Sequence, residues 1–474
     1  MTKNKAKNKS ISTSPPRGMR DFLPQEVHKR FYAIETIRRV YESHGFEPIE
    51  TPSLENLSVL SGKYGEEGDR LLFKVLKRGE KLEAALSKIK AATKKGEGEK
   101  TGSEGLADLG LRYDLTVPIA RVIAHNRGKI PRLFKRYQIQ PVWRADRPAK
   151  GRFREFYQCD VDIVGSLSPA VEVDLLEAAT EALKALGFDD FKIRLNHRKL
   201  LFGMLSLAGI EGERALSAVT ALDKLDKLGV EGVKKELEER GILKESIDGI
   251  EPLLNSPKGK EALPYLTPIC YGNEDAKEGL AETKQILELM QNGPAGEQII
   301  LDPCLARGLD YYTGAIFEIQ SPALGVSLAG GGRYDNLIGM FSGEDVPACG
   351  ISLGLERIIK IMEDLMLFPD IQTCPHLLVT CWSEDLLCHS LDLSRRFRKA
   401  GLSVDIHFDP GKIGKQLKYA ETKGIRFAAI IGPEEGEKDL IALKDLSTGK
   451  QETLSFEGAL DQMFSAFQIK GEDF

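Results

Sequence analysis

The sequence predicts a protein of mixed helices and strands with three domains, one of them mainly helical and one an alternation of strands and helices. Three observations lead to this prediction. Strand and helix patterns are mixed up to residue 196 and return after residue 293, residues 197–292 are mostly of helical pattern, and strands alternate with helices from about residue 375. A length of 474 residues, 42% of them hydrophobic, suits about three domains of ordinary size.

The composition favours a soluble protein of the cytoplasm. No apolar run of about 18 residues occurs, and no hydrophobic segment follows the N-terminal lysines, so neither a membrane span nor a secretory signal is predicted. Seven cysteines, odd in number and scattered, fit a reducing compartment better than a disulfide framework. With 66 basic and 71 acidic residues, the net charge is -5, so any polyanionic partner has to bind at local basic clusters.

The N-terminal elements are predicted from spacing and composition. Residues 1–16 are basic and rich in Ser, Thr and Asn, which predicts a disordered tail. The helical spacing of Val27, Phe31, Ile34 and Ile37 predicts an amphipathic helix that stops at Gly45. The segment FEPIET then predicts a short strand, with Pro52 at its end or on an exposed edge. Residues 77–105, charged and glycine-rich around one possible helix, predict a surface insertion.

Two strands are predicted around the cationic stretch RADRPAKGR, which begins at Arg144. Because side chains alternate along a strand, Phe156, Gln158, Asp160 and Asp162 share one face, opposite an apolar face that belongs to the core. If the two strands pair through the basic loop, Arg144 reaches the same side of the sheet as Gln158 and Asp162. The alternative is a surface hairpin whose charges form salt bridges in solvent.

Other polar segments favour a binding site over a solvated hairpin. LRYDLTVPIAR looks like a strand running into a helix, and it places Arg112, Asp114 and Thr116 on one strand face. AGGGRYDNL supplies three glycines, where a loop can approach a ligand without Cβ atoms in the way. GISLGLERIIK ends a strand and begins a helix with Arg357 in its first turns, and helix N-termini favour anions. ARGLDYYTGAIFEI places Arg307, Asp310, Tyr311 and Tyr312 just before another strand.

The C-terminal segments predict a small α/β domain with a largely parallel sheet. Cys374, Cys381 and Cys388 recur every seven residues near His376 and His389. Their spacing crosses a strand and a helix and matches no zinc pattern, so we expect no metal site made of cysteine and histidine.

Together these segments resemble a class II aminoacyl-tRNA synthetase, and specifically the histidyl-tRNA synthetase family. GFEPIETPSLE is similar to the first motif of the class, whose proline, here Pro52, lies at a dimer interface, and residues 134–165 and 350–358 are similar to the second and third motifs. ARGLDYYTG and AGGGRYDNLIGMF are similar to two signatures of the histidine enzyme. The resemblance runs from about residue 17 to the end, except for the insertion, and FYQCDVDIVG looks closer to the eukaryotic and archaeal type.

The resemblance implies a fold and a division of the chain. The fold is an α+β catalytic domain on an antiparallel sheet flanked by helices, with a helical insertion domain and a C-terminal α/β anticodon-binding domain. The catalytic domain comprises residues 17–196 and 293–370, the helical domain residues 197–292 and the anticodon-binding domain residues 375–474.

The implied reaction is ATP-dependent ligation of L-histidine to tRNA(His) through a histidyl-adenylate, by a homodimer with Mg²⁺ on the phosphates. Because a carboxylate attacks a phosphate, positioned cations are the main requirement. For ATP the resemblance assigns Arg144 to the α-phosphate, Arg152 and Arg357 to the γ-phosphate end, Phe156 and Arg357 to the two faces of adenine, and Asp146 to its amino group. For histidine it assigns Asp114, Thr116 and Gln158 to the ammonium, Asp162 and Tyr312 to the ring, and Tyr311 to the wall. Arg307 holds the substrate carboxylate and the α-phosphate together.

The tRNA is expected to contact two regions. Its acceptor end enters near residues 147–152, and Lys412, Lys415, Lys418 and Lys423 are candidate phosphate contacts of the C-terminal domain, although a solvated helix face explains these lysines nearly as well. Two rival functions stay open: a regulatory relative such as the ATP phosphoribosyltransferase regulatory subunit, and an RNA-binding sensor without chemistry. The regulatory relative lacks the C-terminal domain and is not expected to keep the whole arginine set. Histidine-dependent pyrophosphate exchange separates the three.

Overall fold

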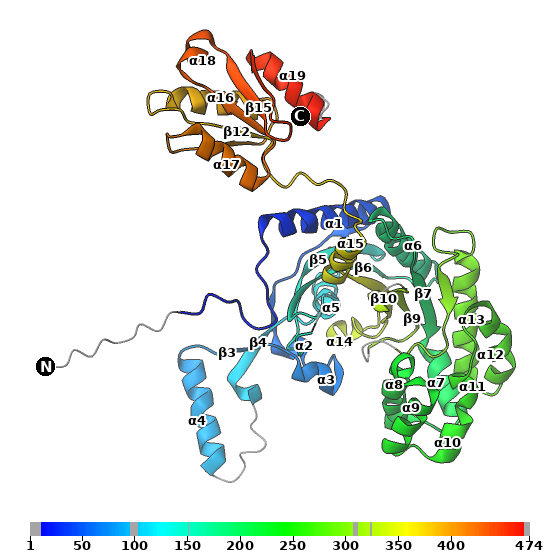
Figure 1. Cartoon of the computed structure of the whole chain (residues 1–474). Helices are drawn as coiled ribbons and strands as arrows, with labels where there is room; N and C mark the ends of the chain where they lie inside the picture. The colour runs from blue at the N-terminus through cyan, green and yellow to red at the C-terminus, as the bar shows by residue number, and fades with distance from the viewer. Residues whose placement is uncertain (1–10, 95–102, 150, 307–310, 323–324, 469–474) are drawn as a thin grey trace. The chain divides into compact units, whose positions relative to one another are not determined.

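The structure, a computed structural model, describes residues 11–94, 103–149, 151–306, 311–322 and 325–468 (Figure 1). Residues 1–10 of the predicted tail, residues 95–102 of the predicted insertion, and Arg307 and Asp310 lie outside these ranges. The chain divides into two compact units, Met1–Pro369 and Asp370–Phe474. Within the described ranges, each helix is too short or too polar to cross a membrane.

An eight-stranded sheet forms the centre of the first unit. Its strands lie in the order β1 (Glu47–Pro48), β5 (Phe134–Trp143), β6 (Glu155–Val164), β11 (Ala348–Gly354), β10 (Val326–Arg333), β9 (Ala315–Ser321), β7 (Lys192–His197) and β8 (Ile299–Leu301). All neighbours are antiparallel except at the two edges, where β1 pairs with β5 and β8 with β7 in parallel. The antiparallel sheet expected from the sequence is confirmed.

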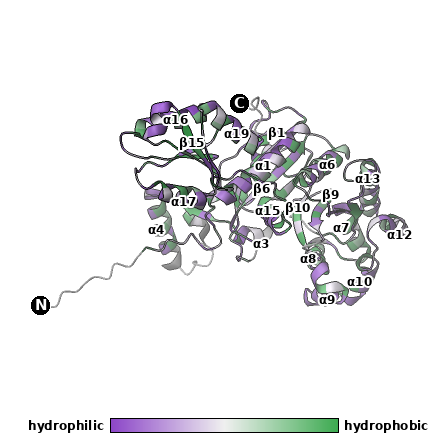
Figure 2. Ribbon diagram, turned by 45° about the horizontal axis from the view of Figure 1, so that its top comes forward, coloured by the Kyte–Doolittle hydropathy of each residue, from purple (hydrophilic) through white to green (hydrophobic). Residues whose placement is uncertain are grey.

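Helices α1 (Pro24–Ser43), α6 (Ala170–Ala185) and α15 (Leu355–Asp364) pack on this sheet (Figure 1). Hydrophilic and hydrophobic positions intermix along them, as expected for helices with one buried side (Figure 2). The predicted first helix is confirmed, but one of its expected core residues is wrong. Phe31 is 63% exposed, and the neighbouring Arg30 is buried in an ion pair of 3.0 Å with Glu356 of α15.

A smaller sheet of β2 (Leu54–Asn56), β4 (Ala107–Leu111) and β3 (Lys74–Leu76) precedes α5 (Thr116–His125). The strand therefore ends before Arg112, and Thr116 already belongs to the helix. The expectation that Arg112, Asp114 and Thr116 share a strand face is wrong, because the backbone turns between the two elements. The described part of the predicted insertion contains α4 (Glu80–Lys94) and the short helix η2 (Ser103–Leu106), and three short helices complete this region: α2 (Leu57–Leu60), α3 (Gly65–Arg70) and α14 (Gly339–Ser342).

Residues 198–290 are helical and have a core of their own, with Leu201, Leu237 and Leu266 at its centre. The glycines that interrupt the helical pattern, Gly209, Gly229 and Gly241, all have positive φ angles of 67° to 79°, which glycine adopts without steric cost. The helices are α7 (Arg198–Leu207), α8 (Gly212–Leu222), α9 (Leu225–Glu239), α10 (Lys244–Gly249), α11 (Glu251–Leu254), η3 (Gly259–Glu261), α12 (Ala262–Cys270) and α13 (Glu274–Met290).

The second unit has a five-stranded sheet and a separate core that includes Phe397, Phe427 and Met463. The strands lie in the order β13 (Val404–Ile406), β12 (Leu377–Val379), β14 (Phe427–Ile430), β15 (Ile441–Asp445) and β16 (Gln451–Leu454), with helices α16 (Leu387–Lys399), α17 (Ile413–Lys423), α18 (Pro433–Lys438) and α19 (Phe456–Phe467). Only the pairings of β12 with β13 and β14 are parallel. The expected largely parallel sheet is therefore wrong for its last two strands: β15 runs antiparallel to β14, and a short turn then joins β15 to β16 as an antiparallel hairpin.

Candidate active site

The cationic loop does connect two paired strands. Arg136 lies opposite Asp162, and Gln140 opposite Gln158, in the antiparallel pair β5 and β6. Cys159 and Val161 belong to the core of the first unit, so the predicted separation of an apolar and a polar face along β6 is confirmed.

The polar face of β6 lines a cavity of about 330 Å³. Side chains from distant parts of the chain reach it: from the start of α5, from the segment before β9, and from β10 and β11. The cavity brings together most residues expected at a histidine site, namely Asp114, Thr116, Gln158, Asp162, Tyr311 and Tyr312, and also Arg144, which is expected at the α-phosphate of ATP. Arg307, the remaining expected residue, lies outside the described residues.

Asp162 has two partners that the sequence did not indicate. Arg136, fully buried, forms an ion pair of 2.6 Å with its carboxylate, and the Tyr334 hydroxyl donates a hydrogen bond to it. Burial raises the pKa of Asp162, while Arg136 and the tyrosine favour the ionised form. Arg136 lies on β5 and Tyr334 in the segment AGGGRYDNL, but their contacts with Asp162 depend on how the strands pair.

Asp114 is held at the beginning of α5. Its carboxylate accepts hydrogen bonds from the Tyr64 hydroxyl at 3.0 Å, the Val117 backbone N–H at 3.1 Å and the Tyr311 hydroxyl at 3.4 Å. Burial raises the pKa of Asp114, and these donors and Arg144 oppose the rise. Arg112 instead points away from the cavity, with hydrogen bonds to the Thr51 and Pro141 carbonyl oxygens, which makes it a structural residue.

The cationic side of the cavity begins at Arg144. Its Nε donates to the Tyr113 carbonyl oxygen at 3.0 Å, and its guanidinium lies 4.3 Å from the Tyr113 ring centroid and 5.2 Å from that of Phe156. This arrangement fixes a positive charge beside an aromatic ring. Such a pair can bind a phosphate and stack on a base.

The other expected ATP residues lie farther along the same loop and on α15. Asp146 is buried and forms an ion pair of 3.1 Å with Arg152. Arg152 and Arg357 both line a second cavity, of about 1270 Å³. Arg357 also donates to the Ser327 carbonyl oxygen at 2.9 Å, which ties the first turn of α15 to β10.

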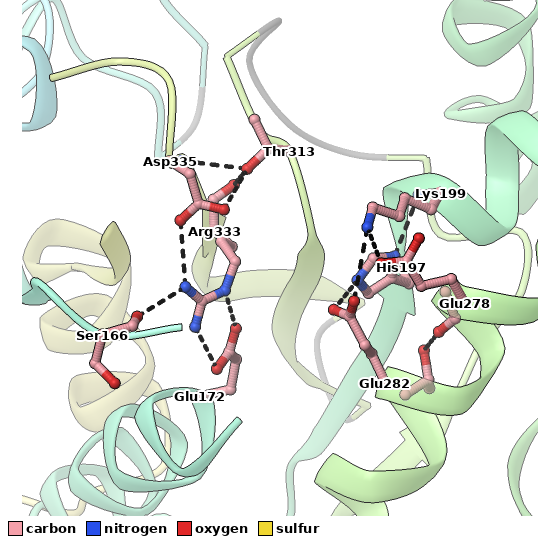
Figure 3. Close-up of polar contacts among 11 residues, drawn as sticks. Ser166, Glu172, His197, Lys199, Glu278, Glu282, Thr313, Arg333 and Asp335 are labelled. Atoms are coloured by element: carbon pink, nitrogen blue, oxygen red, sulfur yellow. Dashed lines mark hydrogen bonds and ion pairs between the residues drawn. The ribbon is translucent and has the colours of Figure 1, made fainter. Parts of the chain in front are cut away.

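A polar network around Arg333 holds Thr313, which follows the two tyrosines in the chain (Figure 3). Arg333 of β10 forms an ion pair of 2.6 Å with Glu172 of α6 and one of 3.2 Å with Asp335. The Thr313 N–H donates to the Arg333 carbonyl oxygen at 2.7 Å, and the Thr313 hydroxyl to Asp335 at 3.2 Å. The segment that carries Tyr311 and Tyr312 is thereby fixed beside β10. The pattern of the sequence does not predict this support.

The glycine run forms part of a strand and not of a loop, which corrects the expectation. Gly330, Gly331 and Gly332 lie in β10, and the first two line the smaller cavity. A Cβ on Gly331 would overlap the Gly350 carbonyl oxygen, and one on Gly350 would overlap the Asp162 carboxylate. The absence of Cβ atoms does make room at the cavity, although the glycines that provide it lie in a strand of the sheet.

An antiparallel sheet backed by helices, with fixed arginines at one end of its central strands and carboxylates at the other, defines a class II aminoacyl-tRNA synthetase. The model of the family described as histidyl-tRNA synthetase matches residues 18–87 and 101–358, and the model of an anticodon binding domain matches residues 376–463. The chain belongs to the histidyl-tRNA synthetase family.

Individual relatives support this assignment to the family. The histidine-tRNA ligase of Christiangramia forsetii is 43% identical over 451 residues, which cover 94% of this chain and 98% of the relative. The crystal structure of histidyl-tRNA synthetase from Nostoc sp. has a TM-score of 0.76 at 31% identity and covers 96% of this chain and 100% of that one. An ATP phosphoribosyltransferase regulatory subunit/histidyl-tRNA synthetase from Bacillus halodurans, at 22% identity, a TM-score of 0.68 and coverage of 86% and 97%, shares the fold.

Proposed function

We propose that this chain attaches L-histidine to tRNA(His) in two steps. Histidine and ATP first give histidyl-adenylate and pyrophosphate, and histidine then passes to the 3′ end of the tRNA. The observation that carries the proposal is the cavity in which Arg144 faces Gln158 and Asp162, in a member of a family that uses ATP.

Arg144 binds the α-phosphate in this proposal, and Phe156 stacks on adenine with Arg357 on its other face. Arg152 and Arg357 hold the γ-phosphate end, where the leaving pyrophosphate carries most of its charge. Asp146 accepts a hydrogen bond from the adenine amino group. Fixed guanidinium groups suit this reaction because they stabilise the charge of the transition state without having to reorganise.

At the other end, Asp114, Thr116 and Gln158 bind the substrate ammonium, and Asp162 and Tyr312 contact the imidazole ring, with Tyr311 as the wall. Arg307 holds the carboxylate next to the α-phosphate. One carboxylate oxygen then attacks the α-phosphorus atom, and the bond to the β-phosphate bridging oxygen breaks. A site with polar partners for the ring rejects apolar analogues by roughly 10⁴-fold or more, because its buried polar groups would stay unpaired.

Mg²⁺ neutralises phosphate charge when it is bound. In the described ranges no three His, Cys, Asp or Glu side chains are grouped as a metal site, which fits an ion that enters with ATP and keeps waters and phosphate oxygens as its main ligands. Among the side chains that line the larger cavity, Glu318 carries a carboxylate, held by an ion pair of 3.2 Å with Arg194, that would be the protein's oxygen ligand for such an ion.

The remaining partners follow from the family motifs. We infer a homodimer whose contact includes the exposed Pro52, in the first class motif. The tRNA contacts residues 147–152 and the anticodon-binding domain. We assign catalysis to residues 17–196 and 293–370, and we place the protein in the cytoplasm, where seven free cysteines are compatible with the reducing conditions.

Histidine-dependent exchange of labelled pyrophosphate into ATP tests the first step. The wild type should exchange with histidine and with no other amino acid, and Arg307→Ala should fold normally and lose roughly 10²-fold or more of the rate. A wild type without exchange would contradict the proposal. Near-normal exchange in Arg307→Ala would remove that residue from the mechanism.

A further inference from the structure

Asp160 is a cavity residue outside the sets proposed to bind histidine and ATP. It lies on β6 between Gln158 and Asp162, on the same polar face, with Gln138 of β5 and Ser352 of β11 as its cross-strand neighbours. It is only 2% exposed and lines the smaller cavity. A carboxylate so deeply buried needs partners, because desolvation of a charge is costly.

The neighbouring carboxylates already have protein donors. Asp162 is bound by Arg136 and Tyr334, and Asp114 by three donors. The Ser352 hydroxyl, which accepts a hydrogen bond from the Gln158 amide at 2.8 Å, supports the ionised form of Asp160. Across the described residues, however, Asp160 Oδ1 has no hydrogen-bond partner, and neither has Gln158 Oε1. Two buried acceptors therefore await donors from a ligand.

The spacing along β6 separates the two acceptors in a useful way. A two-residue step along a strand is about 6.6 Å, somewhat more than the separation between the ammonium nitrogen and the farther ring nitrogen of an extended histidine side chain. If Gln158 accepts from the ammonium, as in the proposed function, Asp160 lies one step towards the ring end of the cavity. A neutral imidazole carries one N–H donor, and a carboxylate oxygen is a strong acceptor for it.

We propose that Asp160 is a further specificity-determining residue of this enzyme, and that its Oδ1 accepts a hydrogen bond from the imidazole N–H of the substrate. The inference rests on the proposed function and deepens it. In this assignment Arg136 compensates the charge of Asp162, and Asp162 shapes and polarises the ring pocket. Asp160 distinguishes a ring that carries an N–H donor from a ring that lacks one. Burial, which raises the pKa of Asp160 to about 7, agrees with a group that a bound donor stabilises.

The test compares Asp160→Ala, which removes the acceptor, and Asp160→Asn, which keeps only a neutral amide oxygen, with the wild type in pyrophosphate exchange. We expect the KM for histidine to rise roughly tenfold or more and the KM for ATP to stay within about twofold. The second substrate is 3-(thiazol-4-yl)alanine, whose ring has the same shape but no N–H. Its kcat/KM should hardly change in the variants, so the preference for histidine shrinks by the same factor.

Asp445→Asn is the matched control, since Asp445 is a buried, hydrogen-bonded aspartate of the second unit and should leave both KM values unchanged. Urea unfolding shows whether each variant folds. Exchange in the wild type together with an unchanged histidine KM in both folded Asp160 variants would overturn the assignment alone. A wild type without histidine-dependent exchange would contradict the proposed function instead. Calorimetric titration of wild type and Asp160→Ala with histidine then decides about Asp160: equal affinity overturns the assignment, and weaker binding by the variant supports it.

Discussion

At the scale of single residues, the ion pair of Arg136 and Asp162 has the largest consequence for stability. Neither side chain is exposed to solvent by more than 3%, and their charges compensate each other. Removing one partner leaves a buried charge without compensation, whereas loss of both partners is less harmful.

We predict that Asp162→Asn lowers the free energy of unfolding by about 3–5 kcal/mol, measured by urea unfolding. The double variant Arg136→Met with Asp162→Leu should be less destabilised than either single variant. Arg38→Ala, which breaks an exposed pair with Glu42 on α1, should leave stability almost unchanged. Equal losses in Asp162→Asn and Arg38→Ala would contradict this account of the pair.

Asp160 makes the free energy of unfolding depend on pH, with a sign opposite to that of a carboxyl group whose pKa is lowered on folding. Its pKa is raised to about 7, mainly by burial, with Asp162 and Asp114 raising it further and Arg136 lowering it. The folded protein therefore binds the proton more tightly than the unfolded chain, and the contribution of this group to stability falls as pH rises from about 4 to 7.

We predict that Asp160→Asn gains stability relative to the wild type between pH 5 and pH 8, because an amide cannot titrate. Urea unfolding of both proteins at the two pH values, without substrate, measures the difference. A difference independent of pH would show that Asp160 keeps an ordinary pKa.

The sequence predicted the face on which a side chain lies but not its hydrogen-bond or ion-pair partners. Alternation along β6 correctly placed Gln158 and Asp162 on the polar face, because the period of a strand depends only on its own residues. Alternation could not show that Arg136 and Tyr334 meet Asp162, because cross-strand contacts depend on register and on a third strand. For the same reason alternation predicts the face on which Asp160 lies but assigns it no ligand.

At the scale of elements, β10 combines structural and binding demands. Gly331 is closed in by the Gly350 backbone, whereas a Cβ on Gly330 would have the Phe317 carbonyl oxygen, at 3.8 Å, as its nearest neighbour. The same substitution at adjacent positions should therefore have different effects.

We predict that Gly331→Ala destabilises the fold, while Gly330→Ala folds normally and raises the KM for histidine, roughly tenfold for one added methyl in the cavity. Urea unfolding and pyrophosphate exchange measure the two effects. If both variants lose stability equally, the difference in space around the two glycines does not affect the free energy of unfolding.

The elements themselves were largely predictable. The first helix, the hairpin of β5 and β6, and the helix that begins with Leu355 were predicted because apolar spacing and glycine positions mark them locally. Two predictions were wrong at positions where contacts with other residues determine the local structure. Arg30 replaces Phe31 on the buried side because Glu356 offers it a partner, and Thr116 begins a helix because Asp114 caps the N–H of Val117.

At the scale of the whole molecule, tRNA binding should depend on the charges of α17. Lys412, Lys415 and Lys418 are exposed, whereas Lys423 forms an ion pair of 2.8 Å with Asp405. Hydrogen bonds to Asp405 and Tyr419 raise the pKa of Lys423 to about 12.

We predict that tRNA affinity falls with salt, and that replacing the three exposed lysines by glutamine reduces the log-log slope by about one unit per lysine that contacts a phosphate. Lys423→Gln is the control and should change the slope less. Filter binding from low to physiological salt gives the slopes. A slope near zero in the wild type would exclude phosphate contacts altogether.

The two units with separate hydrophobic cores have a consequence for heating. Each core can melt by itself, so a calorimetric scan should contain two transitions instead of one. Histidine and ATP bind only to groups of the first unit in the proposed site, and a ligand stabilises the folded form to which it binds. Added together, they should move one peak to higher temperature and leave the other in place, which would allow the melting curve to report occupancy of the site without any measurement of turnover.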